Sequence, residues 1–155
     1  MRHIITILLQ NEAGALSRVA NLFSTRAYNI ESLAVAPTLD ASVSKLTLVT
    51  TGDDLVISQL TSQLRKLVDV VSADDVTKTR QAERELLLIK LQVTSANMAT
   101  VKALFSATDG HTLSTSGTQI VAEVIADEAS ISAFLTNISK HAEIIEAVRS
   151  GTLAI

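Results

Sequence analysis

The two halves of the chain repeat one hydrophobic pattern, which restricts the fold to two copies of a common unit. Residues 4–10 and 86–92 are apolar runs rich in β-forming residues, and they are separated by an offset of 82. The pairs that keep this offset are Val19 and Val101, Leu22 and Leu104, and Phe23 and Phe105. The pairs at a later offset of 74 are Ile57 and Ile131, Leu60 and Phe134, Leu64 and Ile138, and Val70 and Ile144. A connection that is eight residues shorter in the second half accounts for the change.

Within the first half, strand-like and helix-like periodicity alternate. The predicted strands are residues 3–10, 30–37, 43–50 and 68–76. Apolar residues with i, i+3, i+4, i+7 spacing predict a helix that runs to about Arg26: Leu16, Val19, Ala20 and Phe23. Asp53 is the predicted N-cap of a second helix. The buried face of that helix is predicted to be Ile57, Leu60, Leu64 and Leu67.

The resulting order βαββαβ occurs twice, and it predicts an α+β protein made of two tandem ferredoxin-like domains. Residues 1–77 form the first predicted domain, residues 78–84 a polar linker and residues 85–155 the second domain. Two helices cover only one face of each four-stranded antiparallel sheet. Because each half is also small, we expect association, either half on half or chain on chain, rather than a monomer.

The composition excludes several classes of function. The net charge is −3 and no basic block is present, which argues against nucleic-acid binding. Hydrophobic residues make up 47% of the chain, enough for a substantial core, but no apolar run approaches the roughly 18 residues of a membrane helix. The absence of cysteine excludes disulfides, thiolate catalysis and cysteine metal sites. We therefore expect a soluble cytoplasmic protein that does not bind a membrane.

No constellation of residues predicts a catalytic site or a metal site. His3, His111 and His141 have no spacing that would bring two of them to one face, so we assign them structural roles. The acidic pairs at residues 53–54 and 74–75 are neighbours in sequence whose side chains point in different directions. None of the common nucleotide-binding, zinc-protease or serine-hydrolase motifs is present.

The turn Asn11-Glu12-Ala13-Gly14 is the strongest candidate for a binding site. A strand-to-helix turn leaves the first N–H groups of the helix unpaired, and these donors with the helix dipole suit a carboxylate. Gly14 would let a ligand approach the backbone, and the amide of Asn11 offers a donor and an acceptor. A purely structural interpretation is that Asn11 caps the turn and Gly14 permits its geometry.

The repeat favours a ligand in the first half. At the offset of 82, Asn11 corresponds to Val93 and Gly14 to Ala96, so the fold itself does not require Asn and Gly at this turn. Asn29 is a second candidate, and the same offset pairs it with His111.

Several runs of the sequence resemble one known family. Residues 8–19, with Asn11-Glu12-Ala13-Gly14-Ala15-Leu16, resemble the opening of an ACT domain, a small-molecule-sensing module of many amino-acid enzymes. Together with residues 23–33 and 35–38, they are similar to the regulatory (small) subunit of acetolactate synthase, also called acetohydroxyacid synthase. The further similar runs are residues 63–70, 83–86 and 148–151. The segment Asn29-Ile30-Glu31-Ser32-Leu33 is the most distinctive, and the resemblance spans essentially the whole chain.

The resemblance implies a regulatory subunit without a catalytic site of its own. Its partner would be a large subunit that carries thiamine diphosphate, Mg²⁺ and FAD, whereas this chain would hold no cofactor. That enzyme condenses two pyruvates to 2-acetolactate and CO₂, or pyruvate with 2-oxobutyrate, for valine, leucine and isoleucine synthesis. The small subunit would activate it and would confer feedback inhibition, usually by valine. Because the second half lacks the effector features of the first, we expect the large subunit to contact the second domain and the linker.

The resemblance also implies a homodimer formed through the ACT domain, with the effector bound between protomers. Asn11, Gly14, Ala15 and Leu16 would hold the effector from one protomer. Asn29 and Ile30 would come from the neighbouring protomer.

Three other classes of function remain open from the sequence. A free-standing ACT-type sensor that regulates another amino-acid enzyme would share the 11–14 turn but would not bind this large subunit. A small enzyme on a ferredoxin-like scaffold would show turnover by the isolated chain. A transcription factor is the weakest alternative, because no helix-turn-helix or basic face is evident.

Overall fold

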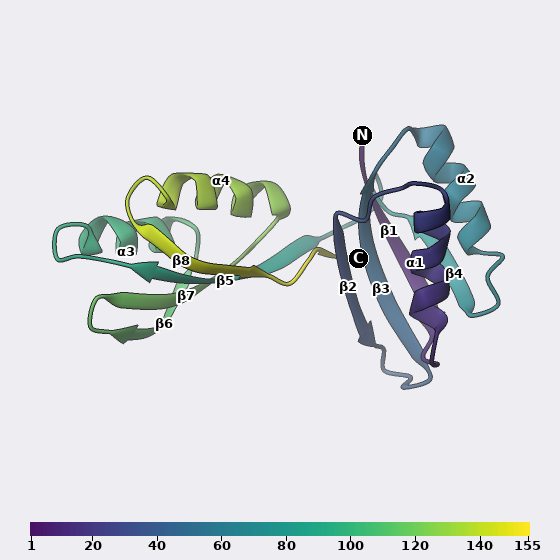
Figure 1. The fold of residues 1–155 in the computed structure, drawn as a ribbon, viewed down its shortest axis with the longest axis horizontal. Coiled ribbons are helices and arrows are strands. Elements are labelled where there is room, and N and C mark those ends of the chain that lie inside the picture. The colour runs from purple at the N-terminus through teal and green to yellow at the C-terminus, as the bar shows by residue number, and fades with distance from the viewer. The chain divides into compact units, whose positions relative to one another are not determined.

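Each half of the chain folds into an antiparallel sheet with two helices on one of its faces (Figure 1). The computed structural model describes all 155 residues and divides into two units. The first unit comprises Met1–Ala82 with Thr152–Ile155, and the second comprises Glu83–Gly151. This division differs from the predicted one at the C-terminus, where the last four residues pack with the first unit.

The elements of the first unit follow the predicted βαββαβ order. They are β1 (Arg2–Gln10), α1 (Ala15–Thr25), β2 (Ser32–Pro37), β3 (Val43–Thr51), α2 (Asp54–Leu64) and β4 (Val70–Asp75). The sheet order is β2-β3-β1-β4, so β2 and β4 are edge strands, and Pro37 ends β2. Alternate residues of β1 and β3 pack against both helices in one core: Ile5, Ile7, Leu9, Leu46, Leu48, Val19, Phe23, Ile57, Leu60 and Leu64.

The second unit has the same element order and the same strand order. Its elements are β5 (Glu83–Gln92), α3 (Met98–Ala107), β6 (His111–Ser116), β7 (Gln119–Ala126), α4 (Glu128–Ile138) and β8 (Glu143–Arg149), in the order β6-β7-β5-β8. The short strand β9 (Leu153–Ala154) belongs to the C-terminal segment. Residues paired by the repeat occupy equivalent core positions, such as Phe23 and Phe105 or Ile57 and Ile131. The predicted fold class is confirmed.

The sequence pattern predicts one connection that is shorter in the second half. In the structure, the difference in length is instead spread over several connections. Tyr28 and Gly110, at the offset of 82, both donate a backbone N–H to the helix that precedes them. By strand register, however, Ala34 and His111 are equivalent, because they pair with Thr47 of β3 and Glu123 of β7. The second unit therefore lacks the segment that holds residues 29–33, and His111 is not the structural counterpart of Asn29. Shorter β2–β3 and β3–α2 connections contribute the rest.

The two second helices begin alike but are capped differently. Asp53 and Asp127 are both N-cap residues, as predicted for Asp53. The carboxylate of Asp127 accepts the N–H of Ser130 at 2.8 Å, and this bond lowers the pKa of Asp127. Asp53 occupies the predicted N-cap position, but its side chain makes no capping hydrogen bond.

We expect Asp127→Ala to lower the free energy of unfolding of the second unit by about 1 kcal/mol, because the Ser130 N–H loses its acceptor. Asp53→Ala is the matched control at the equivalent position, and it should cost the first unit less. Urea denaturation of the full chain, followed by circular dichroism, measures both values. Equal losses for the two variants would contradict the capping difference.

Candidate effector site

Residues 11–14 join β1 to α1, and their backbone geometry depends on Gly14. Gly14 is the N-cap of α1 with φ +86°, a left-handed conformation that glycine adopts at little cost. No side chain caps this helix. The N–H groups of Leu16 and Ser17 lie in the first turn, where no preceding helical carbonyl can accept them. The helix therefore presents uncapped donors and its positive dipole end to a ligand.

Asn11 also has a structural role in this chain. Its side chain is exposed, and Nδ2 donates to the carbonyl of Ala41 at 3.0 Å. Its backbone N–H donates to the carbonyl of Ser42 at 2.8 Å. Asn11 thus connects the end of β1 to the β2–β3 hairpin, which is the structural interpretation that the sequence left open. Ala15 is buried in the core, whereas Leu16 is partly exposed.

A guanidinium beside Gly14 adds positive charge that the sequence analysis missed. Arg18, on the next turn of α1, makes a two-pronged ion pair with Asp69, with Nη2 2.9 Å from Oδ1 and Nε bonded to Oδ2. The third nitrogen, Nη1, lies 3.1 Å from the position that a Cβ on Gly14 would occupy. The hydrogen bonds from Arg18 hold the pKa of Asp69 below its ordinary value, against the opposing effect of burial. Asp69 therefore holds the guanidinium of Arg18 so that Nη1, which does not bind Asp69, lies at the start of α1.

The other predicted site residues lie at the far end of α1. Asn29 is exposed and Ile30 is partly buried against the first core, between α1 and β2. The carbonyl of Asn29 accepts the hydroxyl of Thr50 at 2.6 Å. Because α1 has 11 residues, its ends are about 16 Å apart. One copy of the chain therefore does not bring residues 11–16 and 29–30 together.

The edge of the first sheet next to α1 carries partly exposed apolar side chains. Leu33 and Val35 of β2 lie opposite the core residues Leu48 and Leu46, so they share the helix-facing side of the sheet. They nevertheless remain 36% and 47% exposed. The edge strand β2 also has unpaired backbone groups along its outer side.

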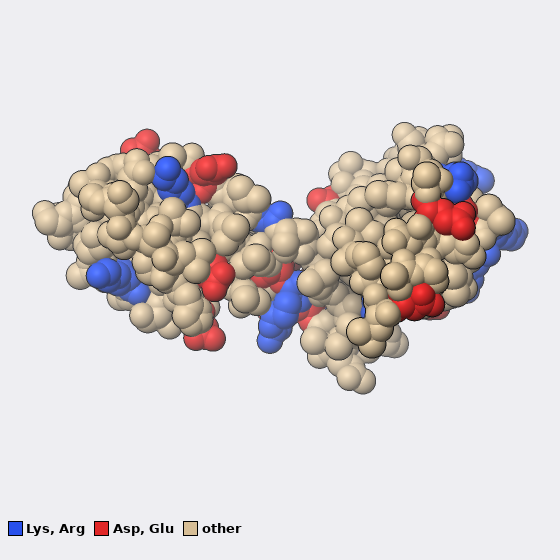
Figure 2. Space-filling model, turned by 90° about the horizontal axis from the view of Figure 1, so that it is seen from below, with Lys and Arg blue, Asp and Glu red and all other residues tan.

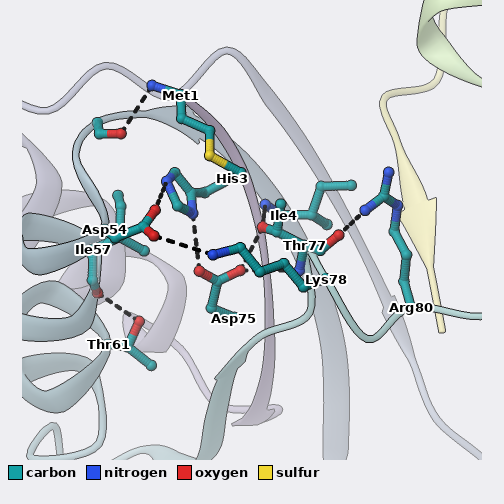
Figure 3. A network of polar contacts seen from close by, with 11 residues as sticks. Met1, His3, Ile4, Asp54, Ile57, Thr61, Asp75, Thr77, Lys78 and Arg80 are labelled. Carbon is teal, nitrogen blue, oxygen red and sulfur yellow. Dashed lines mark hydrogen bonds and ion pairs between the residues drawn. The ribbon is translucent and has the colours of Figure 1, made fainter.

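A separate polar cluster surrounds His3 at one end of β1 (Figure 3). His3 is 2% exposed, and Nδ1 lies 2.9 Å from a carboxylate oxygen of Asp75. Asp54, at the start of α2, lies 3.5 Å from Nε2 and 3.1 Å from Nζ of Lys78. Burial raises the pKa of Asp75, but hydrogen bonds from Thr77 and the contact with His3 outweigh it, so the pKa is lowered. The cluster ties β1 to α2 and β4, and it lies outside the candidate site.

The two remaining histidines lie in the second unit. His111 is exposed on the edge strand β6, and His141 is exposed after α4. No group of three or more His, Asp or Glu side chains could hold a metal ion. No helix is long and apolar enough to cross a membrane. On the face shown in Figure 2, Lys and Arg side chains are interspersed with Asp and Glu.

Comparisons with known proteins agree over the whole chain. A family model described as an acetohydroxyacid synthase small subunit-like ACT domain matches residues 5–72. A second, described as the small subunit of acetolactate synthase, matches residues 84–155. The acetolactate synthase isozyme 3 small subunits of Salmonella typhimurium and Escherichia coli are each 39% identical over 100% of this chain and 95% of their own length. The crystal structure of the acetolactate synthase small subunit from Thermotoga maritima has a TM-score of 0.88 and 28% identity, and it covers 100% of this chain and 96% of its own.

The Arg18–Asp69 pair predicts a pH dependence of stability. Because the folded-state pKa of Asp69 is lowered, the pair stabilises the fold above the ordinary carboxyl pKa of about 4, and this contribution is lost as the pH falls through the folded value. We expect Asp69→Asn to lower the thermal midpoint at pH 7, with the difference from wild type shrinking below about pH 4. The control is Asp74→Asn, which breaks the exposed pair with Arg65 and should change the midpoint little.

Proposed function

Because the chain belongs to the family of acetolactate synthase small subunits, we propose that it binds and activates the catalytic large subunit and makes it subject to feedback inhibition by valine. Thiamine diphosphate, Mg²⁺ and FAD would all belong to the large subunit in the cytoplasm, and this chain would carry no chemistry of its own. The observation that carries the proposal is the uncapped start of α1 at Gly14, placed in a chain that resembles small subunits over its whole length.

The effector site is formed by two copies of the first unit. Residues 11–16 and 29–30 lie at opposite ends of α1, so a small ligand cannot touch both within one chain. If two β2 strands pair antiparallel across a two-fold axis, the α1 helices lie side by side in opposite directions. The start of α1 in one protomer then lies beside residues 29–30 of its partner. The apolar edge at Leu33 and Val35 supports this arrangement.

The chemistry of the loop suits an amino-acid carboxylate. The N–H groups of Leu16 and Ser17 would donate to the carboxylate, and Nη1 of Arg18 would add a positive charge beside Gly14. Asn29 of the partner protomer would hold the ammonium end. Leu16 and the partner's Ile30 would surround a small branched side chain. The absence of a side chain at residue 14 leaves room for the carboxylate next to the backbone.

Inhibition requires that the effector bind two arrangements of the complex with different affinity. A ligand held by two protomers makes different contacts whenever the protomers shift, because its two halves are fixed to different chains. The proposed site therefore favours the dimer arrangement in which both sets of contacts are made. Burial of apolar surface at the edge of β2 in the same arrangement adds to this preference.

The large subunit is proposed to contact the second unit. The face of its sheet opposite the helices exposes Leu88, Ile125 and Val148, which are 39%, 55% and 52% exposed. A shallow depression on this face is lined by Leu88, Ile89, Lys90, Val121, Glu146 and Val148. We assign this face to the catalytic subunit, because the effector features belong to the first unit and are absent from the second.

Acetolactate formation by the cognate large subunit tests the proposal directly, measured with and without this chain across a valine titration. We expect activation, and inhibition that rises with valine. Gly14→Asp should raise the valine concentration for half-inhibition more than about tenfold, because its carboxylate occupies the anion site and pairs with Arg18. A substitution at Gly14 tests the site more specifically than one at Asn11, because the Asn11 side chain also holds the β2–β3 hairpin.

Gly117→Asp is the matched control for this substitution. Gly117 also has a positive φ, +57°, but it lies in the β6–β7 turn, where a Cβ would have no atom within 4 Å. It should retain wild-type valine inhibition despite similar backbone strain. Full valine inhibition in Gly14→Asp would contradict the site. No activation and no complex with the large subunit would instead favour a free-standing sensor.

The contact with the large subunit has its own test. Leu88→Glu places a charge on the open face of the second sheet, where it should weaken binding of the large subunit and reduce activation. Leu55→Glu is the control, since Leu55 lies in the first turn of α2 and is 78% exposed. Titration of the large subunit with each variant gives the half-activating concentration. Equal values for Leu88→Glu and the wild type would overturn the assigned face.

A further inference from the structure

The C-terminal segment Thr152–Ile155 lies on the first unit although it follows the second unit in sequence. Its side chains alternate between buried and exposed. Thr152 and Ala154 are 1% and 4% exposed, whereas Leu153 and Ile155 are 56% and 71% exposed. This period of two is the pattern of a strand that rests one side on a surface. We call these four residues the C-terminal strap.

The strap covers part of the face of the first sheet that the helices leave open. Ala154 packs with Ile4 of β1, Val49 of β3 and Val76 in one small buried cluster. The neighbouring residues Ile5 and Leu48 point to the helices instead. Because side chains alternate across a strand, Ile4 and Val49 lie on the opposite face, where the strap excludes water from them.

Hydrogen bonds hold both ends of the strap. The N–H of Thr152 donates to Oγ of Ser32 at 2.9 Å, and Arg2 donates to the Thr152 hydroxyl at 3.4 Å. At the other end, Ile155 and Ala82 exchange backbone hydrogen bonds at 3.2 and 3.1 Å. The N–H of Gln81 also donates to the carbonyl of Ile155, at 2.6 Å. These hydrogen bonds fix both ends of the strap to residues of the first unit.

The bond to Ser32 brings the strap to the proposed effector segment. Ser32 is the first residue of β2 and follows residues 29–31 directly. On its other side this segment is fixed to β3, because Glu31 N–H donates to the carbonyl of Val49. Val49 in turn packs against Ala154 of the strap. A shift of the 29–31 segment therefore displaces groups that hold the strap.

The second unit shows that the fold does not require such a cover. By strand register, Ile4 and Val49 correspond to Leu86 and Ile125, each pair being cross-strand neighbours. Ile125 is 55% exposed, whereas Val49 is 2% exposed. The same position is thus open in one unit and covered in the other, so the strap serves the first unit specifically.

We infer that the strap is the element through which occupancy of the effector site acts on the second unit. This inference rests on the proposed function. Gly151 joins the strap to the second unit by the covalent chain, and Ser32 joins it to the effector segment. Effector binding sets the position of residues 29–32 and so biases how the strap docks. Undocking the strap should leave effector binding and activation in place and remove inhibition.

The test uses the complex with the cognate large subunit and two variants in neighbouring residues. Ala154→Glu places a charge among Ile4, Val49 and Val76 and should undock the strap. Leu153→Glu introduces the same charge at an exposed site and is the control. For Ala154→Glu we expect wild-type activity without valine, valine binding detected by calorimetry, and loss of inhibition at saturating valine. Leu153→Glu should be inhibited as the wild type is.

Full inhibition in Ala154→Glu would overturn the inference, as would loss of valine binding together with loss of inhibition. If the wild-type complex does not respond to valine, both the proposed effector and the role of the strap are overturned. Measurement of the wild-type complex alone therefore distinguishes this outcome from a failure of the strap inference only. Circular dichroism of both variants reports whether each is folded.

Ser32→Ala provides a second variant that removes only the acceptor of the Thr152 N–H. Ser32→Ala should weaken valine inhibition while leaving the fold intact. If Ala154→Glu does not fold, inhibition of the Ser32→Ala complex tests the role of the strap instead. Hydrogen exchange on the free wild-type chain gives a readout apart from activity. The amides of Thr152 and Ile155 should exchange more slowly than in Ala154→Glu. Equal, fast exchange in both proteins would show that the strap is not docked, and would overturn the inference.

Discussion

Two helices on a four-stranded sheet bury only one of its faces, and this constraint governs the rest of the molecule. Each unit is too small to leave a second apolar face in water without cost. In the first unit, the chain's own C-terminal residues cover part of the open face at Ile4 and Val49. In the second unit, the equivalent region at Ile125 stays exposed. The two units therefore have equivalent cores, but they differ in how much apolar surface remains exposed on the open face of the sheet at these positions.

The elements of both units could be predicted because their signals are local. A helix that packs on a sheet repeats apolar residues every three or four positions, and Phe23 and Phe105 fall in register within such stripes. The βαββαβ order of these elements then indicated the ferredoxin-like fold class, which the structure has. That the second unit has no counterpart of Asn29 could not be predicted in this way. Asn29 lies in a connection without periodicity, where a constant offset paired it with His111 although strand register pairs His111 with Ala34.

The candidate site was predictable only in part, for a similar reason. Gly14 stood out because its turn precedes a helix stripe, and the structure gives it the positive φ that glycine favours. The Arg18–Asp69 pair could not be predicted, because its members are 51 residues apart and no periodic pattern relates them. The strap was also missed. Four residues are too few for an alternating pattern to be recognised. Ala154 is also buried by Ile4 and Val49, which are distant from it in sequence.

The positions of residues 11–16 and 29–30 at opposite ends of α1 are the physical reason why the proposed effector site requires a second copy of the chain. The core of the first unit fixes α1 rigidly through Val19 and Phe23, so its two ends keep their separation whatever binds. A ligand that touches only the start of α1 would meet a site with one conformation and could shift no equilibrium. In the proposed dimer, a ligand that also touches residues 29–30 of a second copy would bind a surface that exists only in one dimer arrangement. Those residues lead directly into Ser32, the group that holds the strap. The proposed site between protomers would thus be continuous, through Ser32, with the segment that leads to the second unit.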